Sequence, residues 1–305
     1  MQISLQPLNQ EILKDPTGLI ARCDQYYNDC VAKAAEAAIA NRHNSPIILL
    51  TGPSSAGKTT TAGRLQKRLQ EAGYGCKMVS MDDYYRDCDH SQYPQTPDGQ
   101  PDLESPYALD TEMLNDHFSK LEAGESVLIP HFDFTTRTRD FSARMPLKLE
   151  NGEFVIFEGL HALNPMFTET HPGAYRIFIC PESDVVDGTE IVFYHTWTRL
   201  MRRCIRDLFH RNASVAVTLS MWENVRRGET LYIQPYISQA NFRINTLHAY
   251  EIPVLAHYME QHIAQLSPST PQYETVMAIK EGLRKFAPLD PALVPETSLL
   301  KEEFI

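Results

Sequence analysis

Four short runs of hydrophobic residues, each about as long as a β-strand, recur along the first part of the chain. They cover residues 47–51, 76–81, 153–157 and 175–180. Such continuous apolar runs are typical of strands that are buried on both faces of a parallel sheet. A segment of helical period lies between the first two runs, at residues 58–71, and Gly73 closes it. A strand, a helix and a second strand in succession predict a right-handed βαβ unit, and therefore an α/β fold with helices flanking a parallel sheet.

The rest of the chain is organised around this predicted core. An alanine-rich helix is expected over residues 17–43 and ends at Asn44-Ser45-Pro46. Further elements are expected as a surface loop at 86–106, a helix at 111–121, a strand at 126–130, a hairpin at 135–149, and helices at 184–211, 246–264 and 272–286. We therefore divide the chain into an N-terminal helical extension (1–44), a core (45–245) and C-terminal helices that pack on it (246–305). Within the core we expect a substrate hairpin at about 130–150 and a helical lid at about 184–227.

Charge and cysteine content narrow the functional classes. The 305 residues include 28 Lys and Arg against 39 Asp and Glu, a net charge of −11, which argues against a protein that wraps nucleic acid. No run approaches the roughly 18 apolar residues of a membrane span, and the N-terminus does not resemble a signal peptide. The six cysteines form no C-x-x-C pair, as is typical of reduced thiols in a cytoplasmic protein. We expect a cytoplasmic protein that binds neither nucleic acid nor membrane, and a homo-oligomer stays open.

The segment Gly52-Pro53-Ser54-Ser55-Ala56-Gly57-Lys58-Thr59 matches the phosphate-loop pattern G-x-x-x-x-G-K-[ST] in full. Glycines let the backbone wrap an oxyanion with its N–H groups pointing inward, and the following helix N-terminus adds partial positive charge. We expect this loop and Thr60 to bind ATP, Lys58 to reach the β- and γ-phosphates, and the Thr59 hydroxyl to hold Mg²⁺. A phosphate loop alone could serve an ATPase, a kinase or a nucleotide sensor, while the lack of an N-K-x-D segment disfavours a GTPase.

Two acidic residues follow predicted strands. Asp82 comes after the second strand and Glu158 ends the strand at 153–157. The carboxyl ends of parallel strands line the ligand crevice, so both carboxylates are expected on the same rim as Lys58. There Asp82 can accept the proton of a substrate hydroxyl that attacks a γ-phosphoryl group. Glu158 can hold Mg²⁺ directly or through water.

Four arginines share one predicted helical face. Arg199, Arg202, Arg203 and Arg206 follow the spacing i, i+3, i+4 and i+7. Like charges at these spacings destabilise an isolated helix, so the stripe is explained if it meets an anion, for which the arginine fork is suited. Pairing with acidic residues elsewhere in the chain is the alternative. Arg226 and Arg227 form a second, less informative basic pair.

Five segments together resemble the uridine kinase and phosphoribulokinase branch of the P-loop kinases. They read GPSSAGKTT, SMDDYYRD, PDLESPYALD, FEGLHALN and RLMRRCIRDLFHRN, and they run in the family's order from Gly52 to Asn212. The later stretch MWENVRRGETLYIQPYISQANFRIN resembles bacterial uridine-kinase-like proteins that often carry a TGS-type domain, for which residues 1–44 are too few. The resemblance implies a P-loop NTPase fold of the nucleoside kinase and phosphoribulokinase type, with ATP and Mg²⁺ as cofactors.

The resemblance also implies roles for single residues. Asp82 matches the catalytic base, Tyr85 an aromatic near the nucleoside, Glu104 an Asp on the ribose hydroxyls, Glu158 the Mg²⁺-associated acid, and Arg203 and Arg206 lid arginines that contact phosphate and substrate. The family's Y-D-F-x-x-H-x-R segment reads FDFTTRTR at residues 132–139. Phe132 can therefore stack on a base but offers no hydroxyl, and Arg137 can only donate where a neutral His also accepts.

These features predict an ATP- and Mg²⁺-dependent kinase of a small hydroxyl substrate, foremost a nucleoside 5′-OH as in uridine and cytidine kinases. A phosphoribulokinase- or pantothenate-kinase-like enzyme with a non-nucleoside acceptor is one alternative. A nucleotide-binding sensor without chemistry is another, although a sensor would need neither Asp82 nor the arginine stripe.

Overall fold

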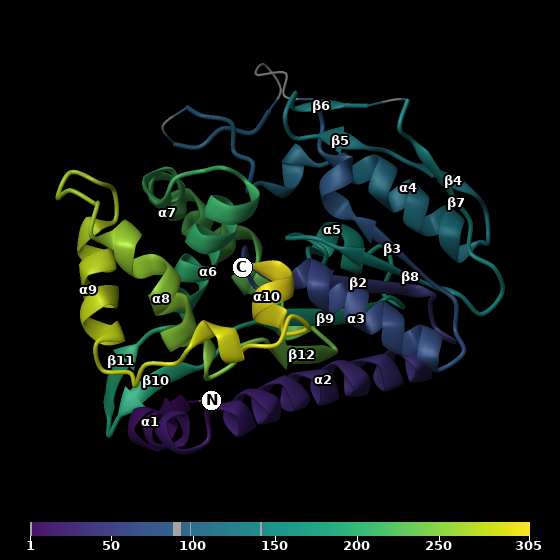
Figure 1. The fold of residues 1–305 in the computed structure, drawn as a ribbon. Helices are drawn as coiled ribbons and strands as arrows, with labels where there is room; N and C mark the ends of the chain where they lie inside the picture. The colour runs from purple at the N-terminus through teal and green to yellow at the C-terminus, as the bar shows by residue number, and fades with distance from the viewer. Residues whose placement is uncertain (1, 88–92, 98, 141) are drawn as a thin grey trace.

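A five-stranded parallel sheet forms the centre of the computed structural model, which describes residues 2–87, 93–97, 99–140 and 142–305. Its strands lie in the order β12 (Phe242–Asn245), β9 (Tyr175–Cys180), β2 (Ile47–Thr51), β8 (Phe154–Glu158) and β3 (Cys76–Ser80). Every residue of β2 and β8 is buried, because layers of helices cover both faces of the sheet (Figure 1). The predicted α/β fold with a parallel sheet is therefore confirmed.

Alternate residues of β2 enter two separate hydrophobic cores. Ile48 and Leu50 pack with α2 (Pro16–Asn41) and α3 (Lys58–Glu71). Ile47 and Leu49 pack on the other face, with α4 (Thr111–Glu122) and the short α5 (Pro165–Thr168). The period of two along a strand thus divides one apolar run between both layers.

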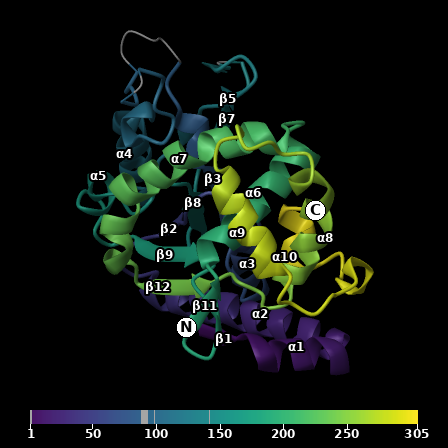
Figure 2. The same ribbon diagram turned by 90° about the vertical axis from the view of Figure 1, so that its left-hand side faces the viewer.

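A group of helices, together with a small second sheet, lies on the side of the central sheet toward which the carboxyl ends of its strands point, and this side faces the viewer in Figure 2. The helices are α1 (Leu5–Lys14), α6 (His195–His210), α7 (Val215–Tyr232), α8 (Glu251–Ile263) and α9 (Tyr273–Leu283). The sheet joins β1 (Gln2–Ser4), β10 (Asp184–Asp187) and β11 (Glu190–Phe193). The last helix, α10 (Leu299–Glu303), returns across the molecule to pack on α3.

The expected helix over residues 184–211 is wrong in its first third. Residues 184–193 form the β10–β11 hairpin, and the helix begins only at His195. Gly188, with a φ of +61°, makes the turn between the two strands. The Asp187-Gly188 pair flanked by Val and Ile is a hairpin signal that outweighs the helical period over this stretch.

Other expected boundaries differ less. The helix expected over 17–43 begins at Pro16, where Asp15 caps it, and a further helix precedes it. The hairpin expected at 135–149 is instead two short strand pairs, β4 (Val127–Ile129) with β7 (Met145–Leu147) and β5 (Phe132–Asp133) with β6 (Thr138–Arg139). Of the loop expected at 86–106, residues 88–92 and 98 lie outside the described residues. No helix among the described residues is long and apolar enough to cross a bilayer.

Candidate active site

The phosphate-loop segment joins β2 to α3. Gly57 has a φ of +88°, a left-handed conformation that favours glycine. A Cβ at Gly52 would lie 2.3 Å from the carbonyl oxygen of Ile179, so this position has no room for a side chain. Lys58 then opens α3, and its side chain lies at the carboxyl edge of the sheet. The loop therefore has the backbone shape and the cation that an oxyanion site needs.

Carboxylates near Lys58 influence the pKa of its ammonium group. Its side chain keeps some solvent exposure, and burial of the ammonium lowers its pKa while Glu158 and Asp82 oppose that shift. Burial raises the pKa of Glu158 to about 7 against the charge of Lys58. The β3–β8 register pairs Ser80 with Glu158 at the ends of neighbouring strands, which explains why Asp82 and Glu158 share one rim.

The two residues expected to bind a metal lie against each other. The Thr59 hydroxyl donates to a carboxylate oxygen of Glu158 across 3.4 Å, a long hydrogen bond. A hydroxyl and a carboxylate are hard oxygen donors, which Mg²⁺ prefers, usually with several water ligands of its own. Among the described residues, no group of three His, Cys, Asp or Glu side chains forms a fuller metal cluster. These two residues therefore fit a Mg²⁺ ion that is shared with substrate phosphates.

Asp82 and Asp83 are neighbours with different surroundings. The carboxylate of Asp83 accepts hydrogen bonds from the Phe132 N–H at 3.3 Å and from His131 at 3.1 Å, which ties β5 to this turn. The carboxylate of Asp82 makes no hydrogen bond to any described residue. Burial raises the pKa of Asp82, and Lys58 opposes the shift. Asp82 thus keeps a free carboxylate beside a cation, as a proton acceptor requires.

Aromatic residues border the same rim. The rings of Tyr85 and Phe132 are 5.5 Å apart, and Phe134 lies 5.0 Å from Phe132. The Tyr85 hydroxyl donates to the carbonyl oxygen of Leu103 at 2.8 Å, so it fixes the segment before Glu104. By contrast, Arg137 is exposed at the β5–β6 turn, and within the described part of the chain no contact joins it to the buried carboxylates.

Glu104 is held in the site by its neighbours. Its N–H donates to Asp102 at 3.2 Å, and Arg227 of α7 pairs with Asp102 at 3.0 Å. A Cβ at Gly228 would lie 2.4 Å from the Cβ of Glu104, so glycine is needed for this approach of α7. Burial raises the pKa of Glu104 to about 7, against the charges of Arg203 and Lys58.

The arginine stripe divides into two pairs. Arg199 and Arg202 are fully buried and form ion pairs with Glu229 and Glu251, so the expectation that the whole stripe meets an anion is wrong for these two. They donate to the carbonyl oxygens of Ser54 and Ser55 and so brace the loop from behind. Arg199 and Arg202 pair within the protein because α7 and the start of α8 supply glutamates to the buried part of the arginine face.

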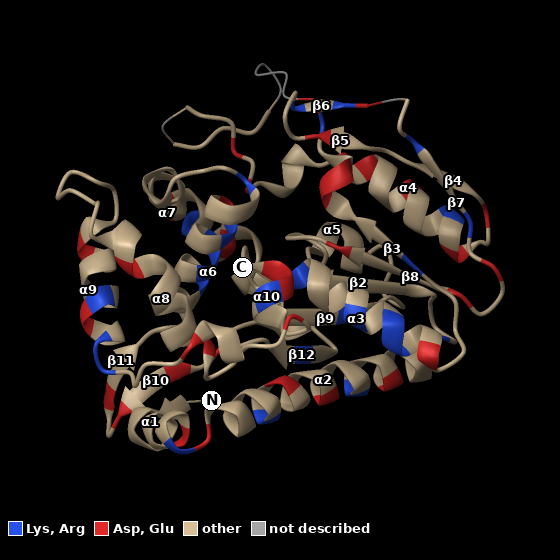
Figure 3. Cartoon of the chain, viewed as in Figure 1, with Lys and Arg blue, Asp and Glu red and all other residues tan. Residues whose placement is uncertain are grey.

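The other two arginines lie nearer the carboxylates. Arg203 donates to the Ser54 hydroxyl at 2.5 Å, and its charge acts on Glu104. Arg206 pairs with the buried Asp207 at 3.0 Å, and its charge acts on Lys58 and Asp82. The structure therefore brings Lys58, Thr59, Asp82, Glu104, Glu158, Arg203 and Arg206 together. Figure 3 shows a basic residue at the start of α3 and charged residues of both signs on α6 and on α10, which lies beside it.

His161 belongs to this group and the sequence analysis missed it. It lies three residues after Glu158, at the carboxyl edge of β8, and is 2% exposed. Neither ring nitrogen is hydrogen-bonded within ordinary geometry to a described residue, and the Glu104 backbone lies near the ring. Burial and the charge of Lys58 lower the pKa of His161 to about 3, so the imidazole is neutral. The rule that selected Glu158, a polar residue just after a buried strand, could also have selected His161.

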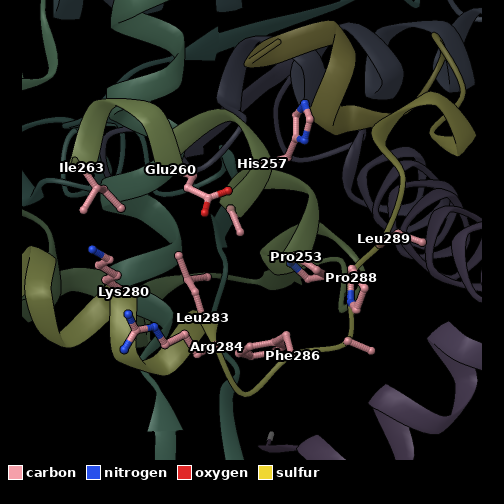
Figure 4. Close-up of a pocket in the computed structure, with 12 residues that line it drawn as sticks. Pro253, His257, Glu260, Ile263, Lys280, Leu283, Arg284, Phe286, Pro288 and Leu289 are labelled. Carbon is pink, nitrogen blue, oxygen red and sulfur yellow. The ribbon is translucent and has the colours of Figure 1, made fainter. Parts of the chain in front are cut away.

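Unsatisfied polar atoms gather around the loop. Buried side-chain atoms without a partner include those of Ser55, His161, Arg199 and Arg203. Buried polar groups are nearly always hydrogen-bonded, so a cluster of open donors and acceptors points to a polar ligand. A separate cavity of about 360 Å³ lies between α8 and α9, where His257, Glu260 and Lys280 meet Leu283 and Phe286 (Figure 4). It contains none of the residues discussed above.

Comparisons with known proteins show the family to which the chain is similar. The family model described as the phosphoribulokinase/uridine kinase family matches residues 47–253. A uridine kinase of Staphylococcus haemolyticus is 26% identical over 182 residues, which are 60% of this chain and 78% of the relative. A uridine kinase of Ligilactobacillus salivarius is 28% identical over 188 residues, 61% of this chain and 78% of the relative. Among solved structures, a candidate fructose transport system kinase from Silicibacter covers 60% of this chain and 84% of its own, with a TM-score of 0.46 and 20% identity.

Proposed function

The chain belongs to the phosphoribulokinase/uridine kinase family, and from that premise we propose that it transfers the terminal phosphoryl group of ATP to a hydroxyl of a small acceptor. The observation that carries this proposal is the Asp82 carboxylate, which has no hydrogen-bond partner among the described residues and shares the carboxyl edge of the sheet with Lys58 of the phosphate loop. A phosphoryl donor and a hydroxyl acceptor can meet between these two groups.

The donor half of the site consists of the loop, Lys58, Thr59 and Glu158. Inward-pointing N–H groups and the Lys58 ammonium would hold the phosphates. Thr59 and Glu158 would hold Mg²⁺, which when bound neutralises charge on the β- and γ-phosphates. The ion pairs of Arg199 and Arg202 keep the loop in this shape through its carbonyl groups. Pre-organised donors of this kind lower the cost of developing charge.

The acceptor half centres on Asp82. Its carboxylate would accept the proton of the attacking hydroxyl, and burial, which raises its pKa, makes it a better base than an exposed aspartate. Arg203 and Arg206 would neutralise charge that spreads over the transferred group. The α6 and α7 segment would act as a lid that excludes water, because water would otherwise take the phosphoryl group.

A nucleoside 5′-OH is the acceptor that the surrounding residues favour. Glu104 and His161 offer a carboxylate and a neutral imidazole that suit the hydroxyls of a sugar. Tyr85 and Phe132 offer ring faces for a base. The names of the uridine kinase relatives support a nucleoside.

A non-nucleoside acceptor remains the second candidate, as in phosphoribulokinase- or pantothenate-kinase-like enzymes. The observation that favours it concerns the residues expected to face a base. Phe132 has no polar group, the Tyr85 hydroxyl is already bonded to Leu103, and Arg137 lies on an exposed turn. The residues expected to face a sugar would accept another polyol equally well.

An ADP-release screen over nucleosides, pantothenate and sugar phosphates tests the proposal, with Asp82→Asn run in parallel. We expect turnover with at least one acceptor, and a loss of about 10²–10⁴ in kcat for Asp82→Asn with ATP affinity retained. Asp116→Asn, an exposed acid paired with Lys120, is the matched control and should keep full activity. Full activity of Asp82→Asn on the best acceptor would remove Asp82 from this role. ATP binding without transfer to any acceptor would favour a sensor.

A further inference from the structure

The end of α10 lies on the start of α3, next to the phosphate loop (Figure 1). One carboxylate oxygen of Glu303 accepts a hydrogen bond from the Thr60 N–H at 3.1 Å and another from the Thr60 hydroxyl at 2.5 Å. The charge of Glu303 also acts on Lys58 and on Glu158. A carboxylate from the C-terminal region is thus part of the electrostatics of the loop.

The Thr60 N–H has a special position in α3. Thr60 is the third residue of the helix, and the N–H groups of the first turn have no partner within a helix. In a phosphate loop, these N–H groups and those of the loop itself are the donors that cradle nucleotide phosphates. An anion at the Thr60 N–H therefore occupies a place that a bound nucleotide would use.

The segment that carries Glu303 is docked on the loop by its own contacts. Arg64 of α3 donates to Glu302 and to the carbonyl oxygen of Thr297, both at 2.7 Å. Leu299 is buried against Gly57, where a Cβ on the glycine would lie 3.0 Å from it. The buried ring of Phe304 lies 4.8 Å from the guanidinium of Arg202. Residues 299–304 are here called the C-terminal plug.

We propose that the C-terminal plug is an autoinhibitory element: the Glu303 carboxylate stands in for a nucleotide phosphate at Thr60, and ATP must displace it to bind fully. This inference rests on the proposed function, because it assumes that the loop binds ATP. The phosphates and Glu303 are both anions that need the same N–H donor, and two anions side by side would also repel each other.

Displacement of the plug would change the measured affinity of the protein for ATP. If only the unplugged state binds ATP with all its donors, the apparent affinity for ATP equals the intrinsic affinity multiplied by the fraction of molecules that are unplugged. A partner or ligand that holds α10 away from α3 would then raise the affinity for ATP without touching the loop.

Titration calorimetry with Mg-ATP on the full chain tests this. We expect Glu303→Ala to lower the dissociation constant about tenfold, the worth of one charge-assisted hydrogen bond, and Glu303→Gln to give a smaller change. Glu281→Gln is the control, since it removes an exposed charge that pairs with Arg284, outside the plug, and should leave affinity unchanged. Unchanged ATP binding by Glu303→Ala would overturn the plug. Weaker ATP binding would also overturn it and would make Glu303 part of the nucleotide site.

Hydrogen exchange on the unaltered protein gives a readout that needs no variant. Addition of Mg-ATP should speed amide exchange in residues 299–304, because their contacts with α3 are released. Equal or slower exchange there, with ATP bound, would overturn displacement. A complete lack of ATP binding by the natural chain and by Glu303→Ala would overturn the proposed function itself, and the plug with it.

Discussion

Arg199 donates hydrogen bonds from Nη1 to both carboxylate oxygens of Glu229, at 2.8 and 2.7 Å, inside the protein. The same guanidinium donates from Nε to the carbonyl oxygen of Ser54 in the phosphate loop, at 3.1 Å. The ion pair therefore links α6 and α7 to the loop, so that packing far from the sheet edge determines the shape of the anion site.

Glu229→Gln should destabilise the protein strongly. The substitution leaves the fully buried Arg199 without its counter-charge, and breaking a buried ion pair costs about 3–5 kcal/mol. Urea unfolding measures the loss in free energy. Glu281→Gln, which removes the exposed partner of Arg284, should cost less than about 1 kcal/mol. Equal losses for the two variants would contradict a bracing role for the buried pair.

His161→Gln should weaken acceptor binding and leave ATP binding intact. The imidazole is buried and neutral, and neither nitrogen is hydrogen-bonded to another side chain among the described residues, so we place it against an acceptor hydroxyl. Loss of such a contact should raise the acceptor KM about tenfold, with a smaller change in kcat. His117→Gln is the matched control, because His117 is bonded to Tyr84 inside the α4 layer. An equal effect of both variants on KM and on unfolding would point to a structural role.

Arg203→Met should lower kcat more than it lowers affinity for ATP. Arg203 contacts Ser54 of the loop and its charge acts on Glu104, between the donor and acceptor halves. Removing a donor that stabilises developing charge typically costs about 10²–10³ in kcat. Steady-state kinetics together with calorimetry separates the two quantities. Arg284→Met, at an exposed position just after α9, should change neither quantity. A loss in ATP affinity alone for Arg203→Met would limit this arginine to ground-state binding.

Stability should fall as the pH rises toward neutrality, in part because of Glu104. Burial raises the pKa of this carboxyl from 4.5 to about 7 in the folded protein. The folded state therefore binds more protons than the unfolded state between these values, and the unfolding free energy falls with rising pH by at most about 1.4 kcal/mol per pH unit for this group. The contribution is complete below about pH 4.5 and is lost above about pH 7.

Glu104→Gln has no titrating carboxyl at this position, so its stability should depend less on pH. Urea unfolding of both proteins at about pH 5 and about pH 8 compares the two slopes. The same slope in both would mean that Glu104 is solvated like an ordinary surface acid.

Much of the donor half of the site could be predicted from the sequence, because its signals are local. The loop from Gly52 to Thr59 is a contiguous motif, and glycines at its ends mark positions that a side chain cannot occupy. The strands β2, β8 and β9 are continuous apolar runs, and their common edge follows from parallel topology alone. The Asp82 and Glu158 positions then follow from where these strands end.

What the tertiary structure alone decided is which partners those residues meet. Helical spacing placed four arginines on one face, but only packing separated them into two pairs. Arg199 and Arg202 meet Glu229 and Glu251. Arg203 and Arg206 do not meet these glutamates, and Arg203 contacts the loop. The contact of Glu303 with Thr60, 243 residues away in sequence, has no local signal, and the position of His161 after β8 does not by itself predict its burial. Periodicity fixes the direction in which a side chain points, whereas its charge state and its ligand depend on groups that distant segments bring to it.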